Sequence, residues 1–164
     1  HALHPLVAAG VRRHRTVDGL TDRHRGYAEL RDRFPREHRR YAGIVLDVLF
    51  DHFLSGDWEQ LRGGDRDAFI ESVYRALGEH QHLVPAPFAA LAPRWVAADW
   101  LHVYTTVEGV DAVFERLATR LRRPDALRAA WAAMRDERET LREGFHTVFA
   151  DVRSALDSPQ TPPA

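Results

Sequence analysis

The sequence predicts an all-α, single-domain protein, and three observations support this prediction. Apolar residues recur at helical spacing along most of the chain, and no segment shows the strict alternation between turn residues that is typical of β-hairpins. The 164 residues suffice for one hydrophobic core but not for two. No uncharged apolar stretch approaches the roughly 18 to 20 residues of a membrane-spanning helix, and the first residues lack a secretory pattern, so we expect a cytoplasmic protein.

Proline and glycine residues divide the first half of the chain into helices. Pro5 suits the first turn of a helix that we expect to reach about Thr21, and a short helix should follow over 23–34. Pro35 is expected to begin a helix that continues through residue 54. A loop with three glycines should then cover 55–65.

The second half is expected to contain four helices. The first two should cover 67–83 and 89–104, and the third should be capped by Thr106 and end near Leu121. The last and longest should run from Pro124 to about Leu156. We therefore predict one helical, HD-phosphohydrolase-like catalytic domain over 1–156 and a frayed tail over 157–164.

The composition excludes several kinds of chemistry. The absence of cysteine excludes thiolate metal sites and cysteine nucleophiles, and because all 23 basic residues are Arg, Schiff-base lysine chemistry is excluded too. The formal charge is −1, but residues 11–40 carry ten Arg against five acidic residues, which predicts a local basic patch. No pattern indicates a nucleic-acid or membrane partner.

The run over 43–54 is apolar almost all round, yet it contains Asp47, Asp51 and His52. A buried carboxylate needs an Arg, a hydrogen-bond network or a cation, because an unpaired buried charge costs several kcal/mol or shifts its pKa. Residues four apart differ by about 40° around a helix, so Asp47 and Asp51 should point the same way, with His52 on the flank.

The first predicted helix shows the same pattern, because His14, Asp18 and Asp22 lie on one face at successive helical turns. Two such helices packed together would bring imidazoles and carboxylates to one point. Oxygen and nitrogen donors of this kind suit Mn²⁺, Mg²⁺, Fe²⁺ or Zn²⁺. The pattern therefore indicates a divalent metal site.

A purely structural alternative fits the same residues. Asp47 and Asp51 would be neutralised by Arg39, by Arg40 or by an Arg of the last helix, and His14 would be a hydrogen-bonded core histidine like His52. The spacing alone does not decide between these two hypotheses.

Longer segments resemble a known family. RHRTVDGLTD at 13–22, RRYAGIVLDVLFDHFLSGDW at 39–58, the Trp100-Leu101 pair and RRPDALRAAW at 122–131 resemble the acyl carrier protein phosphodiesterases, in the same order along the chain. The most specific element is His-x3-Asp-x3-Asp combined with a later Asp-x3-Asp-His-Phe-Leu. The Asp51-His52 order departs from the His-Asp order of ordinary HD proteins.

The resemblance implies a Mn²⁺-dependent, all-helical enzyme of the HD phosphohydrolase superfamily that removes 4′-phosphopantetheine from holo acyl carrier protein, an acidic protein. On this basis the expected metal ligands are His14, Asp18, Asp51 and His52. The family usually carries a preceding segment with further His and Asp, and nothing before His1 matches it, which leaves room for a ligand outside these residues.

Phosphodiester chemistry suggests roles for the remaining candidates. A carboxylate outside the metal shell positions or deprotonates the attacking water, and Asp22 and Asp47 are the candidates for this catalytic role. Guanidinium groups fork onto phosphate oxygens, so the expected substrate-binding residues are Arg12, Arg13, Arg15 and Arg40.

Two other functions fit the sequence. One is an HD-type phosphohydrolase of a small nucleotide or another phosphoester. The other is a non-catalytic all-α module that binds an acidic protein through Arg, with its Asp and His residues forming core salt bridges.

Overall fold

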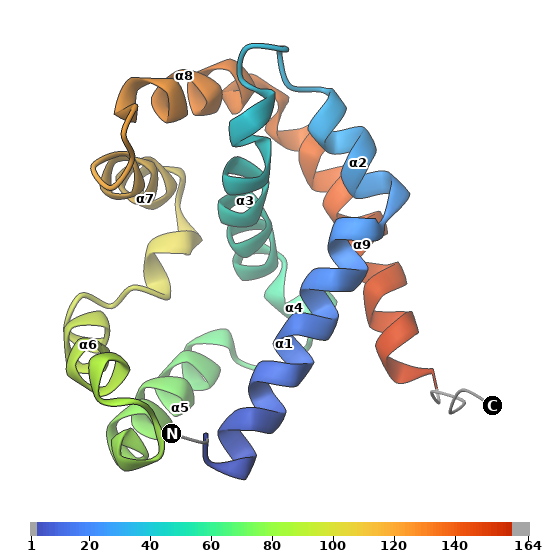
Figure 1. The fold of residues 1–164 in the computed structure, drawn as a ribbon. Coiled ribbons are helices and arrows are strands. Elements are labelled where there is room, and N and C mark those ends of the chain that lie inside the picture. Colours follow the sequence, from blue (N-terminus) through green and yellow to red (C-terminus); the bar gives the residue numbers. More distant parts are fainter. Residues whose placement is uncertain (1–2, 159–164) are drawn as a thin grey trace.

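The computed structural model describes residues 3–158, and every regular element in that range is helical (Figure 1). The α-helices are Pro5–Arg23 (α1), Arg25–Asp32 (α2), Ala42–Gly56 (α3), Trp58–Leu61 (α4), Arg66–Glu79 (α5), Ala86–Ala97 (α6), Val107–Ala118 (α7), Pro124–Met134 (α8) and Arg138–Asp157 (α9). Short 3₁₀ turns cover Arg39–Tyr41, Gln81–Leu83, His102–Thr105 and Arg135–Glu137. The all-α prediction is confirmed, whereas the likeness to HD phosphohydrolases stays a prediction.

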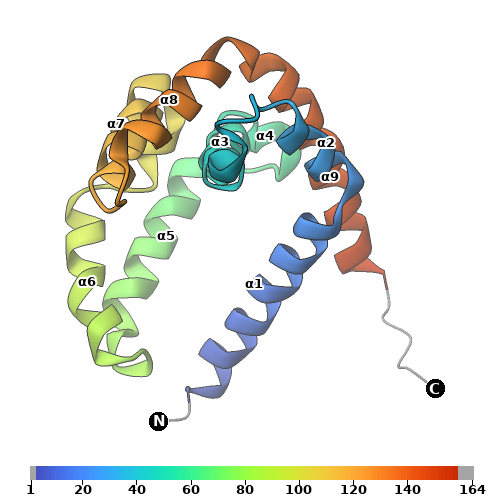
Figure 2. The same cartoon turned by 45° about the horizontal axis from the view of Figure 1, so that its top comes forward.

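Helix α3 forms the centre of the core. Its Val45, Leu46 and Leu49 side chains are fully buried, as the apolar run over 43–54 predicts. Figure 2 looks along α3 and shows α2 and α9 on one side of it and α7 and α8 on the other. Because neighbours surround most of α3, only a narrow strip of this helix reaches solvent, and that strip carries Asp47 and Asp51.

Several helix boundaries follow from local chemistry. Pro5 occupies the first turn of α1, where its missing N–H is no loss. Thr106 caps α7, because its Oγ1 accepts a hydrogen bond of 3.1 Å from the Gly109 N–H. Asp65 caps α5 in the same way and accepts from the N–H groups of Asp67 and Ala68.

Several predicted boundaries are wrong. The helix expected from Pro35 begins at Ala42, the loop expected over 55–65 contains α4, and the helix expected over 89–104 ends at Ala97. The long last helix is two helices, since the 3₁₀ turn Arg135–Glu137 separates α8 from α9. One straight helix over 124–156 would be about 50 Å long, and the turn instead lets α8 pack on α7 and α9 pack on α2.

The predicted frayed tail lies mostly outside the described residues. Asp157 is the last residue of α9, and residues 159–164 are not described. No helix in the described range is long and apolar enough to cross a membrane.

Asp57, at the junction of α3 and α4, joins this junction to α9. Its side chain is only 6% exposed and accepts hydrogen bonds from the Arg142 guanidinium and, at 2.9 Å, from Nε2 of His146. These interactions, the Arg142 hydrogen bonds above all, hold the pKa of Asp57 below its usual range. We call these three residues the Asp57 clamp.

We predict that Asp57→Asn lowers the free energy of unfolding by about 2 kcal/mol at neutral pH, because it removes a charged partner that Arg142 and His146 share. A lowered pKa contributes stability that is present above the ordinary Asp value near 4 and is lost as the pH falls through the folded-state value. The difference between the two proteins should therefore shrink in urea titrations below about pH 4. Glu59→Gln, an exposed charge removal two residues away, is the control; an equal effect of both substitutions at neutral pH would contradict the prediction.

Candidate active site

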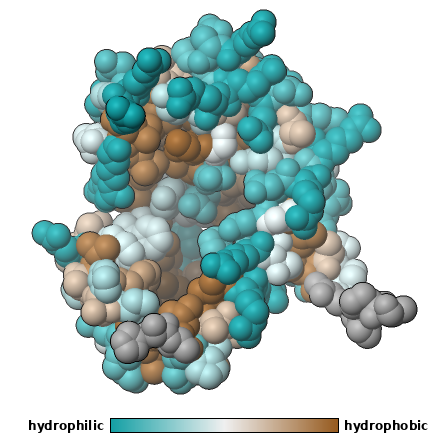
Figure 3. All heavy atoms as spheres, viewed as in Figure 1, coloured by the Kyte–Doolittle hydropathy of each residue, from teal (hydrophilic) through white to brown (hydrophobic). Residues whose placement is uncertain are grey.

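A groove of about 640 Å³ lies between α1, α3, α4 and α9 and is lined mainly by apolar side chains; we call it the central groove. Figure 3 shows the open face of the molecule, where α1 and the α5–α6 pair flank a hollow and carry apolar surface. The lining comprises Arg13, Val17, Thr21, Phe50, Asp51, Leu54, Trp58, Leu61, Arg62, Phe69, Phe145, Val148, Phe149, Val152, Arg153, Leu156 and Asp157.

Asp51 is the acidic side chain that α3 presents to this groove. It also lines a smaller pocket of about 190 Å³, formed with Trp100, Leu101 and Tyr104, so its carboxylate lies between two cavities. The Asp51 side chain is exposed to solvent, yet the surrounding protein partly desolvates its carboxylate. This desolvation, together with the nearby charge of Asp47, raises the pKa of Asp51 to about 6.

Asp47 lies one turn earlier on α3 and faces carboxylates of α1. Desolvation raises its pKa, and the negative charges of Asp22 and Asp18 raise it further, while a hydrogen bond from Tyr27 opposes the shift. The structure therefore gathers Asp18, Asp22, Asp47 and Asp51 into one region of mutual repulsion, which we call the carboxylate cluster.

Tyr27 of α2 closes the inner side of the carboxylate cluster. Its hydroxyl donates to Oδ1 of Asp47 at 3.4 Å, and its ring is buried against Phe50. Burial, followed by the charges of Asp47 and Asp22, raises the pKa of Tyr27 to about 12, so this residue remains a neutral donor.

The observed contacts do not agree with the structural alternative, in which an Arg neutralises Asp47 and Asp51. Among residues 3–158, neither carboxylate forms a salt bridge with an Arg. Arg39 pairs with Asp32, and Arg142 of α9 binds Asp57. The buried Asp–Arg pair exists, but at an aspartate that the sequence did not single out.

The two candidate histidines lie apart. His14 is 76% exposed on α1, and its Nε2 is 3.6 Å from Oδ2 of Asp18. His52 faces the segment before α7, where its Nδ1 is 2.7 Å from the backbone carbonyl oxygen of Tyr104. The carbonyl can only accept, so Nδ1 is the donor in this contact.

The donor chemistry suits a hard divalent cation, but the geometry does not form a complete site. The carboxylates of the cluster repel one another, which a cation would relieve. However, no three His, Asp or Glu side chains within residues 3–158 lie close enough together to bind one metal ion. A cation at this position would need further ligands or a closer approach of α1 to α3.

The predicted substrate-binding arginines occupy two different regions. Arg13 lines the central groove, and Arg12 and Arg15 are exposed on the same helix. Arg40 lines a separate pocket at the start of α3. The segment 11–40 carries ten Arg against five acidic residues, but these arginines therefore do not form one continuous surface of the site.

Two further arginines of the central groove escaped the sequence analysis. The guanidinium of Arg62 lies 5.4 Å from the ring of Trp58 and 4.9 Å from that of Phe69, which fixes its position by cation–π contacts. Arg153 donates to the backbone carbonyl of Leu61. The four-residue spacing of Trp58 and Arg62 is the one sequence signal that indicates the first of these contacts.

A polar network next to Trp100 was also not predicted from the sequence. Nδ1 of His102 is 2.6 Å from Oδ1 of Asp99, which also accepts from the Tyr74 hydroxyl at 3.0 Å. These bonds hold Asp99 at a positive φ of 48°, a conformation that a residue other than Gly rarely adopts. The network orders the turn between α6 and α7, which contributes Trp100 and Leu101 to the pocket beside Asp51.

The fold and the site together indicate the class of protein. An all-helical domain whose apolar groove presents an unpaired carboxylate beside several guanidinium groups is suited to acid–base chemistry on an anionic substrate.

Comparison with known proteins gives the family. A family model described as acyl carrier protein phosphodiesterase matches residues 1–152. Proteins named acyl carrier protein phosphodiesterase are similar to this chain in Salmonella agona (32% identity over 142 residues, 86% of this chain and 74% of that protein) and in Yersinia enterocolitica (31% over 157 residues, 95% and 81%). The chain belongs to the acyl carrier protein phosphodiesterase family, as the resemblance predicted. No solved structure matches it.

We predict that Asp51→Asn stabilises the protein at pH 7 to 8 in the presence of a chelator. A carboxyl group with a raised pKa contributes stability below its unfolded value near 4 and loses it as the pH rises through about 6. Because Asp51 is exposed, solvent screening reduces the gain on removing its charge to the order of 1 kcal/mol. Thermal unfolding should show a higher midpoint for the variant than for the wild type at neutral pH, and no difference between the two midpoints below about pH 4.

Asp136→Asn, which removes an exposed charge at the turn between α8 and α9, is the control for this measurement. A lower midpoint of Asp51→Asn at neutral pH would show that the ionised carboxylate stabilises the fold and would contradict the prediction.

Proposed function

We propose that this protein hydrolyses the phosphodiester bond between 4′-phosphopantetheine and a serine of holo acyl carrier protein, in the cytoplasm. The observation that carries the proposal is the unpaired Asp51 carboxylate in an apolar groove whose lining includes Arg13 and Arg62. Membership of the acyl carrier protein phosphodiesterase family supports the choice of substrate.

The lining of the central groove suits the prosthetic group. The arm is a chain of methylene and amide groups, and Phe50, Phe145 and Phe149, which line the groove, offer it apolar surface. Arg13 has no salt bridge in the described part of the chain, so its guanidinium is available to bind the phosphodiester oxygens. Arg62 is held by stacking and supplies a second positive charge.

Asp51 is the proposed general base. With a pKa near 6 it is mostly ionised at neutral pH, yet it is more basic than an ordinary aspartate, which suits proton transfer from water. The water oxygen bonds to phosphorus as the bond from phosphorus to the serine Oγ breaks, and a proton must reach that oxygen. Asp51, whose pKa is raised by burial and then by the charge of Asp47, can take this proton from the water and return it to the serine oxygen.

A divalent cation, Mn²⁺ in the first place and otherwise Mg²⁺, Fe²⁺ or Zn²⁺, is the proposed cofactor. The sequence analysis assigned His14, Asp18, Asp51 and His52 to it. The charges of Asp18 and Asp22 act on Asp47, so we propose these three as its ligands after a closer approach of α1 to α3, which leaves Asp51 to the groove. A bound cation would neutralise phosphate oxygens and lower the pKa of a bound water.

We predict that purified protein with Mn²⁺ converts holo acyl carrier protein to the apo form, detected by mass spectrometry as loss of the arm. Asp51→Asn should lower kcat at least 100-fold, the usual contribution of a general base, while the protein stays folded. Asp136→Asn is again the control. Unchanged turnover by Asp51→Asn would remove Asp51 from the mechanism.

The same assay separates the alternative functions. Hydrolysis of p-nitrophenyl or cyclic-nucleotide esters without any conversion of holo carrier protein would favour the small-phosphoester enzyme. Binding of carrier protein without hydrolysis under any metal condition would favour the non-catalytic module.

We predict that Mn²⁺ stabilises the wild-type protein. A cation present at 100 times its dissociation constant adds about 2.7 kcal/mol, which corresponds to a rise of roughly 5 to 11 °C in Tm for a chain of this size. Asp47→Ala should abolish most of this rise. Equal rises for the wild type and for Asp47→Ala would exclude Asp47 as a ligand, and no rise for the wild type would contradict tight binding of Mn²⁺ by these residues.

A further inference from the structure

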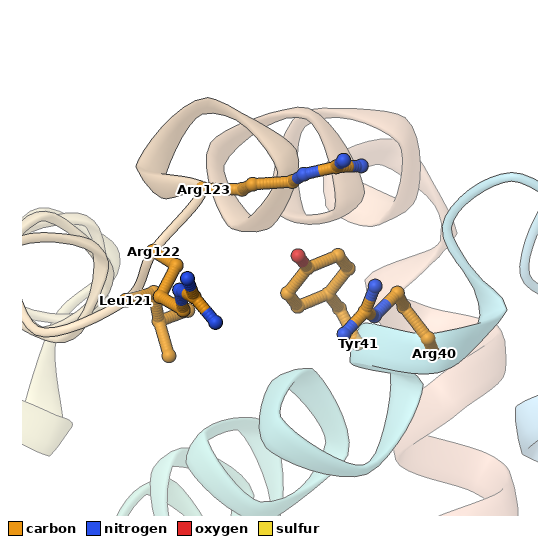
Figure 4. Close-up of a pocket in the computed structure, with 5 residues that line it drawn as sticks. All are labelled: Arg40, Tyr41, Leu121, Arg122 and Arg123. Carbon is orange, nitrogen blue, oxygen red and sulfur yellow. The ribbon is translucent and has the colours of Figure 1, made fainter.

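A second pocket of about 640 Å³ lies at the opposite end of α3 from Asp51. It is lined by Arg40, Tyr41, Leu121, Arg122 and Arg123. Figure 4 shows the guanidinium groups of the three arginines gathered around the ring of Tyr41, with Arg40 coming from the segment before α3 and the other two from the segment between α7 and α8. We call this the arginine pocket.

The charge of the arginine pocket is uncompensated within the described residues. None of its three guanidinium groups forms a salt bridge or a side-chain hydrogen bond there, and no acidic residue lines the cavity. Neighbouring arginines differ: Arg39 pairs with Asp32, and Arg128 with Glu115 and Asp125. Three like charges around one cavity repel one another, so an anionic group that enters it gains from all three.

Local contacts and a helix start position two of these arginines. The guanidinium of Arg40 lies 5.2 Å from the centre of the Tyr41 ring, and this ring is only 7% exposed. Arg123 is the N-cap residue of α8, so it precedes a helix N-terminus whose dipole adds to the positive potential. An incoming carboxylate would thus meet donors from two parts of the chain that are about 80 residues apart.

The arginine pocket is too far from the central groove to bind the same phosphate. The two cavities share no lining residue. Tyr41 and Asp51 are ten residues apart, which is about 15 Å along a helix. A ligand that engages both places must be large, and a folded protein that carries its own carboxylates meets this requirement.

We propose that the arginine pocket binds acidic side chains on the surface of the carrier protein while its prosthetic arm occupies the central groove. This inference rests on the proposed function. It assigns Arg40, Arg122 and Arg123 to protein recognition rather than to the reacting phosphate, and it places a docking surface for the carrier at the start of α3.

The test measures hydrolysis of holo acyl carrier protein and, separately, binding of fluorescently labelled apo acyl carrier protein by anisotropy at low and high salt. The variant is Arg122→Glu with Arg123→Glu. The control is Arg75→Glu with Arg94→Glu, which changes the charge equally at exposed positions of α5 and α6 that line neither pocket. Circular dichroism checks folding, and Arg122→Gln with Arg123→Gln replaces the charge reversal if that variant unfolds.

We expect the Arg122/Arg123 variant to raise KM and the dissociation constant for apo carrier protein about tenfold or more, with a smaller change in kcat and a weaker salt dependence. The control should behave as the wild type. Equal effects of the variant and the control, or a fall in kcat at constant KM, would overturn the proposal.

Two further outcomes keep this proposal separate from the function on which it rests. Hydrolysis by the wild type combined with unchanged KM for the variant overturns the docking site and leaves the proposed function intact. If the wild type neither hydrolyses holo carrier protein nor binds the apo form, both fall. If inorganic phosphate raises the Tm of the wild type but not of the variant while KM is unaffected, the pocket binds small anions only, and the docking proposal is again overturned.

Discussion

Repulsion among the carboxylates of α1 and α3 is the constraint on which the site depends. Asp47 and Asp51 share the solvent-facing strip of a helix that is otherwise packed into the core, and within residues 3–158 no guanidinium neutralises either of them. The fold must offset this cost elsewhere. It does so through the buried face of α3 and through the Asp57 clamp, which ties the end of α3 to α9 and thereby fixes one wall of the central groove.

Helix content and most helix starts could be predicted from the sequence, because periodicity, Pro5 and the Thr106 cap act locally. The break between α8 and α9 could not. No Pro or Gly interrupts the segment 125–143, and the chain turns at Arg135–Glu137 because two different parts of the core lie on either side of the turn. The start of α3 at Ala42 rather than Pro35 has the same origin, since tertiary packing overrides a favourable first-turn residue.

The candidate site was predictable to the extent that it depends on one helix. Four-residue spacing places Asp47 and Asp51 on one face, and both lie in the carboxylate cluster. Pairing across the chain was not predictable. Arg142 binds Asp57, 85 residues away, and Arg40 meets Arg122 and Arg123 only because α3 and α8 pack together. Sequence proximity grouped Arg40 with Arg12, Arg13 and Arg15, whereas the fold separates it from the helix that carries them.

The charges around the two cavities bear on how the proposed anionic substrate binds. A phosphodiester near Asp51 brings two negative charges together, and at 4 Å this costs about 4 kcal/mol at an effective dielectric constant of 20. Arg13, Arg62 and Arg153 lie around the same groove and offset this repulsion only in part, because Asp47 adds to it. The proposed cation at the carboxylate cluster would remove the remainder locally. The arginine pocket, which no carboxylate lines, would in the proposed docking mode attract the carrier before its arm meets the acidic end of α3.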